Sequence, residues 1–158
     1  MSNKKMMVII GIVLILDMVS KYVVSSLMVE NQSFSIINNF FRITYVKNTG
    51  AAFSFLDGNV LVLILVTIFF LGCMFYYTFF KVKNFWEGVS YGLVLGGAIG
   101  NFIDRSILGY VRDFIDIDIF GYDYPIFNIA DCFIVIGILM YLFISFYKER
   151  CSRVGNKS

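Results

Sequence analysis

Two carboxyl groups surrounded by apolar residues are the first chemically notable feature of this sequence. Asp113 lies in the segment Val111-Arg112-Asp113-Phe114-Ile115, and Asp131 is the one charged residue between positions 126 and 147. Two carboxyls that approach closely share one proton and titrate as a unit. The ionised member then takes a proton from water, while the protonated member polarises a carbonyl group. Asp113 and Asp131 are therefore the candidate catalytic pair, and this chemistry requires no metal and no cofactor.

Other polar residues stand in or beside apolar stretches. Asp17 and Lys21 are four residues apart and can pair on one helical face, which favours a structural ion pair. Asn128 precedes Asp131 by three residues. Each of these positions is expected at the same end of a helical bundle. The same end is expected to receive a further group, formed by Asn101, Asp104 and Arg105.

Several other chemistries are excluded or weakly supported. The chain has no histidine and three cysteines without a CxxC pair, so a histidine-based site, a disulfide framework and a structural zinc site are not expected. A dyad of Ser20 and Lys21 is disfavoured because adjacent helical residues diverge by about 100°. A calcium loop is only faintly indicated, since the required terminal glutamate is lacking. Its ligands would be Asp116, Asp118 and Asp123.

The composition indicates what must position these groups. Hydrophobic residues make up 59% of the 158 residues and charged residues 15%, which argues against a soluble globular protein. The net charge of +2 is too weak to suggest nucleic-acid binding. Four stretches are long and apolar enough to cross a membrane as helices. We predict an all-α membrane protein with one domain over residues 1–158 and helices at about 6–24, 60–80, 86–103 and 126–147.

The distribution of basic residues predicts the orientation of these four spans. Lysines and arginines collect before the first stretch, between the second and third, and after the fourth. By the positive-inside rule both termini should be cytoplasmic. The outer segments, at about 25–59 and 104–125, should face outward. The start of the chain resembles a signal peptide, but its apolar run is long enough to span and we expect it to be retained.

The outer segment at about 25–59 is not simply a linker. Phe34-Ser35-Ile36-Ile37 and Phe41-Arg42-Ile43-Thr44-Tyr45-Val46 are rich in β-forming residues and alternate in part. They predict a small extracytoplasmic β-rich element. Glycine recurs every fourth residue in the third stretch, which predicts a helix face that a neighbour approaches closely. These glycines are Gly88, Gly92, Gly96 and Gly100.

Five motifs, taken in order, give a resemblance to a known family. They are Asp17-Met18-Val19-Ser20-Lys21, Asn48-Thr49-Gly50-Ala51-Ala52-Phe53, Gly100-Asn101-Phe102-Ile103-Asp104-Arg105, Val111-Arg112-Asp113-Phe114 and Phe127-Asn128-Ile129-Ala130-Asp131. In this order the sequence closely resembles the bacterial lipoprotein signal peptidases, also called signal peptidase II. Two positions depart from the family pattern: Arg112 stands where an apolar residue is usual, and Cys132 where serine is frequent.

The resemblance implies an activity that composition does not reveal. Members of the family are aspartic endopeptidases that cut diacylglyceryl-modified prolipoproteins just before the lipidated cysteine. By resemblance, Asp113 and Asp131 form the catalytic dyad, and Asp17 and Lys21 are structural or lie near the site. Residues that support the site or bind substrate would be Asn48, Gly50, Asn101, Asp104, Arg105 and Asn128.

Further expectations concern the surroundings. The resemblance implies the bacterial cytoplasmic membrane, with the active site toward the extracytoplasmic face. Lipid-modified prolipoproteins and membrane phospholipid are the expected partners, and a monomer is the expected state. The segment after Asn48 is expected to begin a helix over the site, with Phe53 and Phe55 on the membrane surface. The rival classes are an ion or solute transporter that uses intramembrane carboxylates, and a structural membrane subunit.

Overall fold

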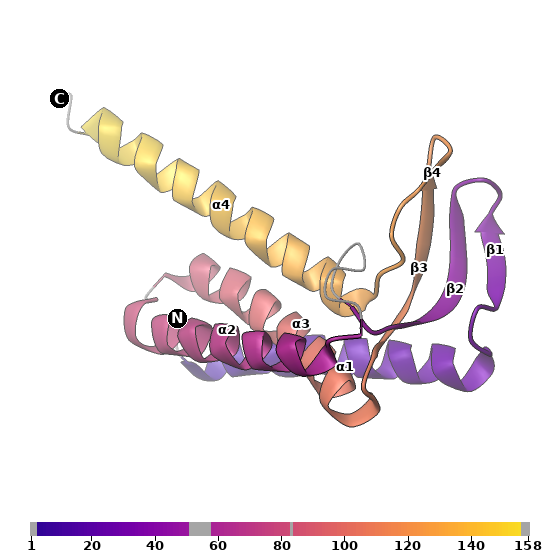
Figure 1. The fold of residues 1–158 in the computed structure, drawn as a ribbon. Helices are drawn as coiled ribbons and strands as arrows, with labels where there is room; N and C mark the ends of the chain where they lie inside the picture. The colour runs from indigo at the N-terminus through magenta and orange to yellow at the C-terminus, as the bar shows by residue number, and fades with distance from the viewer. Residues whose placement is uncertain (1–2, 51–57, 83, 156–158) are drawn as a thin grey trace.

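A computed structural model describes residues 3–50, 58–82 and 84–155 of the chain (Figure 1). Within these ranges the helices are α1 (Asn3–Leu27), α2 (Val60–Lys81), α3 (Phe85–Leu108) and α4 (Ile129–Gly155), and the strands are β1 (Ser33–Ile37), β2 (Phe41–Asn48), β3 (Val111–Ile119) and β4 (Tyr122–Asp123). Both chain ends lie on one side of the molecule and the sheet on the other. The prediction of a mostly helical protein with a small β-rich element is thus confirmed.

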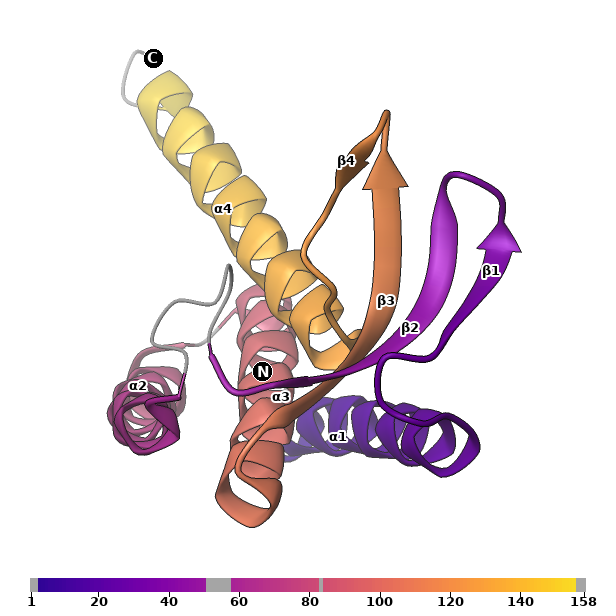
Figure 2. The same ribbon diagram turned by 45° about the vertical axis from the view of Figure 1, so that its right-hand side comes forward.

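Helix α3 lies among the other three helices (Figure 2). Its glycine ladder faces α1: a Cβ on Gly92 would meet Ile9 at 3.0 Å, and one on Gly96 would meet Val13 at 2.7 Å. Gly100 continues the ladder against the Asp17 side chain. Steps of four residues on both helices show that α1 and α3 run parallel and in close contact, as the glycine spacing predicted.

Helix α4 runs antiparallel to α3. A Cβ on Gly137 would meet the Ser90 carbonyl oxygen at 2.7 Å, near the start of α3. Gly97, further along α3, lies against the Ala130 carbonyl at the start of α4. The end of α3 and the start of α4 therefore meet at the side of the molecule that carries the sheet.

Within the described part of the chain, three helices are long and apolar enough to cross a membrane: α1 over Lys4–Leu27, α2 over Val60–Phe80 and α4 over Ile129–Cys151. Many of their large apolar side chains are exposed, among them Ile15, Phe69 and Phe143. Such surfaces require an apolar solvent. Helix α3 has 24 residues, but its glycines and its charged end make it less apolar, and it is not among these three.

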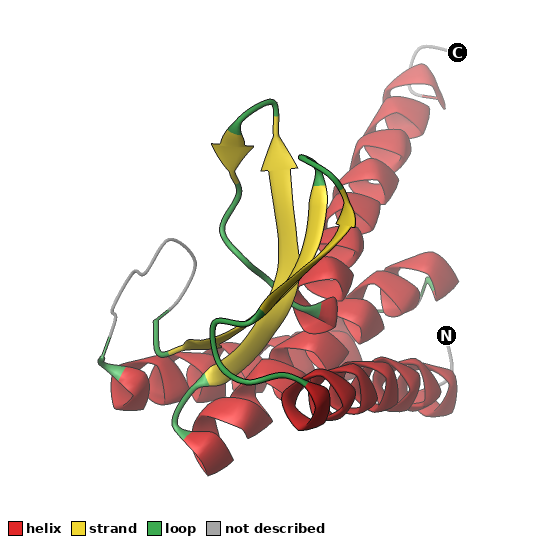
Figure 3. Cartoon of the chain, turned by 90° about the vertical axis from the view of Figure 1, so that its right-hand side faces the viewer, coloured by secondary structure: helices red, strands yellow, loops and turns green. Residues whose placement is uncertain are grey.

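The strands form one sheet in the order β1-β2-β3-β4, and every neighbouring pair is antiparallel (Figure 3). Strands β1 and β2 lie in the two segments for which alternation predicted strands, and they form a hairpin; β3 arises in the second outer segment. Ile115 on β3 also pairs with Phe127, just before α4. This bridge holds the start of α4 against the middle of β3.

Three predicted ends of α3 and α4 differ from the structure: both helices continue further than predicted, to Leu108 and Gly155, and α4 begins later. Helix α3 continues to Leu108 and ends at Gly109, whose φ of 79° suits the left-handed helix end. Asp104 and Arg105 are therefore helical and do not belong to the outer segment. Helix α4 begins at Ile129 rather than near 126, because the residues before it pair with β3.

Candidate active site

The ends of α1, α3 and α4 and the strands β2 and β3 bring the predicted site residues together. Asp113 lies on β3 and is 2% exposed. Its Oδ2 accepts a hydrogen bond from Asn48 Nδ2 at 2.8 Å, and its Oδ1 accepts one from Asn128 Nδ2 at 2.6 Å. Val46 is the β2 partner of Asp113, so Asn48 reaches it diagonally across the two strands.

Asp131 lies in the first turn of α4, where the helix dipole favours a negative charge. Its Oδ2 accepts from the Asn128 backbone N–H at 3.1 Å, and the Asn128 Oδ1 accepts from the Asp131 backbone N–H at 3.1 Å. This reciprocal pair caps the helix, which explains the three-residue spacing. Asn128 was expected on a face of the helix, but it precedes the helix and caps it.

Asn101 connects Asp131 to a buried ion pair. Its Nδ2 donates to Asp131 Oδ1 at 2.7 Å, and its Oδ1 accepts from Lys21 Nζ at 2.8 Å. Lys21 in turn lies 2.8 Å from Asp17 Oδ2, and both of these side chains are fully buried. Asp17 Oδ1 accepts the Ala130 backbone N–H at 3.0 Å, so the predicted ion pair also fixes the start of α4.

Asp104 and Arg112 form a second buried pair that the sequence did not indicate. Arg112 Nη2 and Nε lie 2.7 and 3.1 Å from the two Asp104 carboxylate oxygens, and the Arg112 backbone N–H also donates to Asp104. The guanidinium thus ties β3 to the end of α3 one residue before Asp113. The family departure at position 112 therefore has a structural partner within this chain.

Arg105 extends from α3 toward the same place. Its Nη2 donates to the Gly50 carbonyl oxygen at 2.8 Å, and its Nε is buried without a hydrogen-bond partner among the described residues. Asn48 Oδ1 accepts the Gly50 backbone N–H at 2.9 Å. The predicted helix after Asn48, with Phe53 and Phe55, falls on residues 51–57 and lies outside the described residues.

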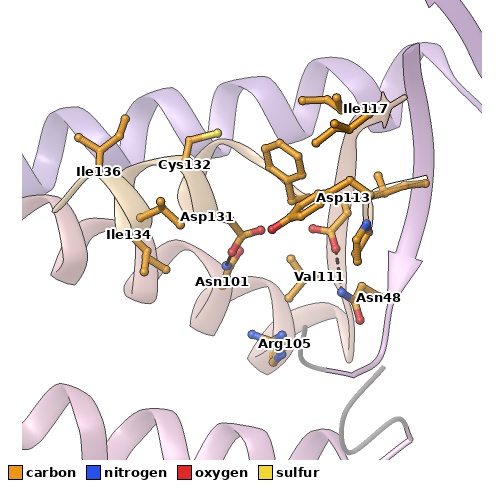
Figure 4. A pocket seen from close by; sticks show the side chains of 16 residues that line it. Asn48, Asn101, Arg105, Val111, Asp113, Ile117, Asp131, Cys132, Ile134 and Ile136 are labelled. Atoms are coloured by element: carbon orange, nitrogen blue, oxygen red, sulfur yellow. Dashed lines mark hydrogen bonds between the residues drawn. The ribbon is translucent and has the colours of Figure 1, made fainter. Parts of the chain in front are cut away.

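A cavity of about 620 Å³ opens over these groups (Figure 4). Asp113 and Asp131 point toward one another in it, with Asn48, Asn101 and Arg105 beside them. The rest of the wall is apolar and comes from β3, from the segment before α4 and from α4 itself. It consists of Val111, Ile117, Ile119, Tyr124, Pro125, Ile126, Phe127, Cys132, Ile134, Val135 and Ile136.

Burial and the neighbouring Asp131 carboxyl raise the pKa of Asp113 to about 7, although hydrogen bonds from Asn48 and Asn128 oppose the shift. By contrast, the Arg42 guanidinium holds the pKa of Asp116, on the same strand, below its ordinary value. The raised pKa of Asp113 keeps a proton available at neutral pH, as general acid catalysis requires.

The weaker chemical alternatives find no support in the geometry. The Ser20 hydroxyl donates to the Asp17 carbonyl, and Lys21 bonds to Asp17 and Asn101, so these two do not form a dyad. Asp116 accepts from Arg42 and Thr44 across the strands. Over residues 3–50, 58–82 and 84–155, no three His, Cys, Asp or Glu side chains group closely enough to hold a metal ion.

Sequence reasoning missed the apolar wall of the cavity. One part of that wall was accessible to it, because alternate residues of a strand share a face. Ile117 and Ile119 lie four and six residues after Asp113 and therefore share its face. The α4 part, including Val135, requires knowledge of how α4 is placed against β3.

Comparisons with known proteins agree with this geometry. The family model described as signal peptidase (SPase) II matches residues 9–147. The chain is 42% identical over 143 residues to the lipoprotein signal peptidase of Staphylococcus carnosus strain TM300, which covers 90% of each protein. It is also 42% identical over 129 residues to the lipoprotein signal peptidase of Staphylococcus aureus strain JH9, covering 81% of this chain and 79% of that one.

Solved structures show the same fold. One, described as a bacterial membrane enzyme determined by the in meso method at 2.3 Å, has a TM-score of 0.85 and 38% identity over 93% of this chain and 90% of its own. A second, at 1.9 Å, has a TM-score of 0.81 and 39% identity over 89% of this chain and 92% of its own. With the motif order, the cavity and these matches taken together, the chain belongs to the signal peptidase II family.

Proposed function

We propose that Asp113 and Asp131 form the catalytic dyad of this chain, which cuts diacylglyceryl-modified prolipoproteins just before the lipidated cysteine. Membership of the signal peptidase II family makes the chain a bacterial membrane peptidase that removes signal peptides from prolipoproteins. The observation that carries the proposal is that the two carboxyls face each other in one cavity, beside Asn48, Asn101 and Arg105, and that the rest of the wall is apolar.

The charges of the site support a dyad that holds a single proton. Four carboxyl groups, those of Asp17, Asp104, Asp113 and Asp131, stand close to three cations. The cations are Lys21, Arg105 and Arg112. One proton on the carboxyls makes this cluster neutral, and a neutral cluster is favoured where burial penalises net charge. Asp17 and Asp104 each contact a cation directly, so the proton belongs to the dyad.

The placement of the dyad assigns the two roles. Asp131 sits at a helix start, where the dipole favours a negative charge, whereas burial and the neighbouring carboxyl raise the pKa of Asp113, so we assign Asp131 as the ionised member. Asp131 takes a proton from water as the water oxygen attacks the scissile carbonyl carbon, and Asp113 gives its proton to the carbonyl oxygen. When the tetrahedral intermediate collapses, the leaving nitrogen takes the proton that Asp131 received, and the carbonyl oxygen returns its proton to Asp113.

The apolar wall suits a substrate that arrives from the membrane. Side chains such as Ile134 and Val135 line the cavity from α4, which is itself apolar enough to span. A signal peptide helix or an acyl chain can contact this wall while the scissile bond reaches the carboxyls. Arg105 lines the cavity beside the two carboxyls, so its guanidinium is placed to donate to a substrate carbonyl.

The proposed topology follows from the helix directions. With α1 and α3 parallel and α4 antiparallel to α3, the starts of α1 and α3 and the end of α4 share one side. Lys5 and Arg150 mark that side as cytoplasmic by the positive-inside rule. Helix α3 then spans as the fourth helix, both termini are cytoplasmic, and the active site faces outward from the cytoplasmic membrane. Action as a monomer and contact with phospholipid stay predictions.

The direct test uses Asp113→Asn and Asp131→Asn in purified, detergent-solubilised protein with a diacylated prolipoprotein as substrate. Each variant should lose at least a thousandfold in kcat, with the wild-type product identified by mass spectrometry of its new N-terminus. Asp118→Asn is the matched control, because Asp118 lies on the same strand but does not line the cavity, and its Oδ1 accepts the Gly121 backbone N–H. Full activity in either dyad variant contradicts the proposal.

The same preparations distinguish a peptidase from a transporter. Proteoliposomes of the wild type should show no solute or ion flux above empty vesicles, while they still process the substrate. Flux that disappears in Asp131→Asn, without any cleavage in the wild type, favours a transporter. A chain that shows neither flux nor cleavage is a structural subunit.

A further inference from the structure

Three asparagines surround the two carboxyls, and each has its amide oxygen held by a nitrogen donor. Asn48 Oδ1 accepts from the Gly50 backbone N–H, and Asn128 Oδ1 from the Asp131 backbone N–H. Asn101 Oδ1 accepts from Lys21 Nζ at 2.8 Å and from Asn128 Nδ2 at 3.1 Å. An amide whose oxygen faces a donor must turn its NH2 group the other way. In all three cases that group donates to a dyad carboxylate.

Asn101 differs from the other two because the shorter of the two hydrogen bonds to its oxygen comes from a side chain on another helix. Lys21 is fully buried on α1, and its ammonium has three hydrogens and no acceptor function. It lies 2.8 Å from Asp17 Oδ2 and 2.8 Å from Asn101 Oδ1. The third carboxylate nearby, Asp104, is 3.7 Å away and is bonded by Arg112. The charge of Lys21 is thus paired by Asp17, and its remaining close bond fixes Asn101.

We propose that Lys21 is a positioning residue of the dyad: it holds the Asn101 amide so that Asn101 donates to Asp131 and keeps that carboxyl ionised. This inference rests on the proposed function and deepens it, since it connects a residue on α1 to the reacting groups through one amide. Without the ammonium, only the longer bond from Asn128 holds the Asn101 oxygen, so the amide rotates more readily and presents that oxygen to Asp131, which an ionised carboxylate disfavours. Asp131 then binds a proton more readily and is a poorer base.

Charged groups from each contacting element surround this chain of bonds. Asp131 is faced by Arg105 from α3, by Asp113 from β3 and by the Cys132 thiol from its own helix. Lys21 is faced by Asp17 from α1, Asp104 from α3 and Asp113 from β3, and Arg112 from β3 lies beyond Asp104. A test must therefore remove the Lys21 bond without leaving an unpaired charge and without altering the other groups.

The double variant Asp17→Asn/Lys21→Met meets this requirement, because it removes both charges and keeps the volumes nearly the same. The readout is the acid limb of the kcat profile, that is, the pH below which kcat declines because the base is protonated. This limb should move up by about one pH unit, which corresponds to the loss of one hydrogen bond to a charged acceptor. At pH values on the limb kcat should fall about tenfold, and KM should change little.

The matched control is Glu87→Gln/Lys148→Met, which removes another acid–lysine pair, between α3 and α4 at the opposite end of the bundle. Its acid limb should coincide with that of the wild type. A general loss of folded protein lowers the active fraction at every pH but does not move the limb. The shift therefore separates positioning from stability.

Asn101→Ala supplies the second test. This variant should move the acid limb by itself, and the addition of Asp17→Asn/Lys21→Met should move it no further, because both changes remove the same hydrogen bond. An unmoved limb in folded Asp17→Asn/Lys21→Met overturns the inference, and so does an additive shift. If the double variant does not fold, an unmoved limb in Asn101→Ala is sufficient to overturn it.

The two proposals fail in different ways. Cleavage that persists in Asp113→Asn or Asp131→Asn disproves the dyad assignment itself. If both dyad variants are inactive and the acid limb of Asp17→Asn/Lys21→Met does not move, the dyad assignment stands and only the role of Lys21 is disproved.

Discussion

Two ion pairs of the same spacing lie at opposite ends of the molecule. Asp17 and Lys21 are four residues apart on α1, and Glu149 and Arg153 are four residues apart on α4. The first pair is 0% exposed on both sides, whereas the side chains of Arg153 and Glu149 are 77% and 56% exposed. Identical sequence spacing has therefore produced one pair inside the bundle and one pair in solvent.

The two ion pairs differ in the other residues that each of them contacts. Asp17 also accepts the Ala130 N–H, and Lys21 also donates to Asn101, so the buried pair links α1 to α3 and α4. The exposed pair connects only residues of one helix. Exposed pairs contribute little because water competes for both partners. A buried pair contributes little net stability either, but removal of one partner leaves a charge that nothing compensates.

The largest stability effect should come from the single substitution Lys21→Met. Asp17 then remains buried without its cation, and the expected loss is about 3–5 kcal/mol. Thermal unfolding in detergent micelles, followed by a fluorescence probe on the free cysteines, measures the change in Tm. Asp17→Asn/Lys21→Met should recover much of the loss. A single variant as stable as the wild type contradicts the contrast between the two ends.

Gly100→Ala should have the next largest effect, because the new Cβ meets the Asp17 carboxylate. Overpacking of this kind destabilises by about 1–3 kcal/mol and should displace the buried pair. Both Tm and kcat should fall. The matched control is Gly72→Ala on α2, where a Cβ meets nothing within 4 Å and a small rise in Tm is expected. Equal behaviour of the two variants argues against close contact of α1 with α3.

The pH dependence of activity sharpens the comparison at the dyad. The pKa of Asp113 is raised to about 7 by burial and by Asp131, so its proton is retained below that pH and lost above it. We expect kcat/KM to fall above about pH 7 and to approach a tenfold loss per pH unit. The sign for stability is the same, since the contribution of this group to the free energy of unfolding declines between its ordinary pKa of 3.8 and about pH 7, and is level above that pH. A profile that is flat to pH 9 contradicts the assignment of Asp113 as the acid.

The smallest effect belongs to the exposed pair. Glu149→Gln should change the free energy of unfolding by no more than about 0.5 kcal/mol, as for other exposed pairs at this helical spacing. The change should shrink further in high salt, because screening weakens exposed charges. Cleavage kinetics should match those of the wild type. A drop in Tm comparable with that of Lys21→Met shows that burial is not what separates the two pairs.

Much of this protein was predictable from local pattern. Apolar runs predicted the helices, alternation predicted β1 and β2, and the four-residue spacing of Asp17 and Lys21 predicted their pairing. Glycine spacing predicted close helix packing, although not which helix would be the neighbour. Helix ends were predicted less well, because the end of α3 depends on Gly109 and the start of α4 depends on pairing with β3.

By itself the sequence determined the residue types available for chemistry, their membrane setting and the family, since these depend on composition, spacing and motif order. Only the tertiary structure decided which donors meet which carboxyls. Lys21 and Asn101 are 80 positions apart, and Arg112 meets Asp104 rather than Asp113. Such contacts arise from helix direction, strand register and the bridge that holds α4 against β3, none of which a local pattern specifies.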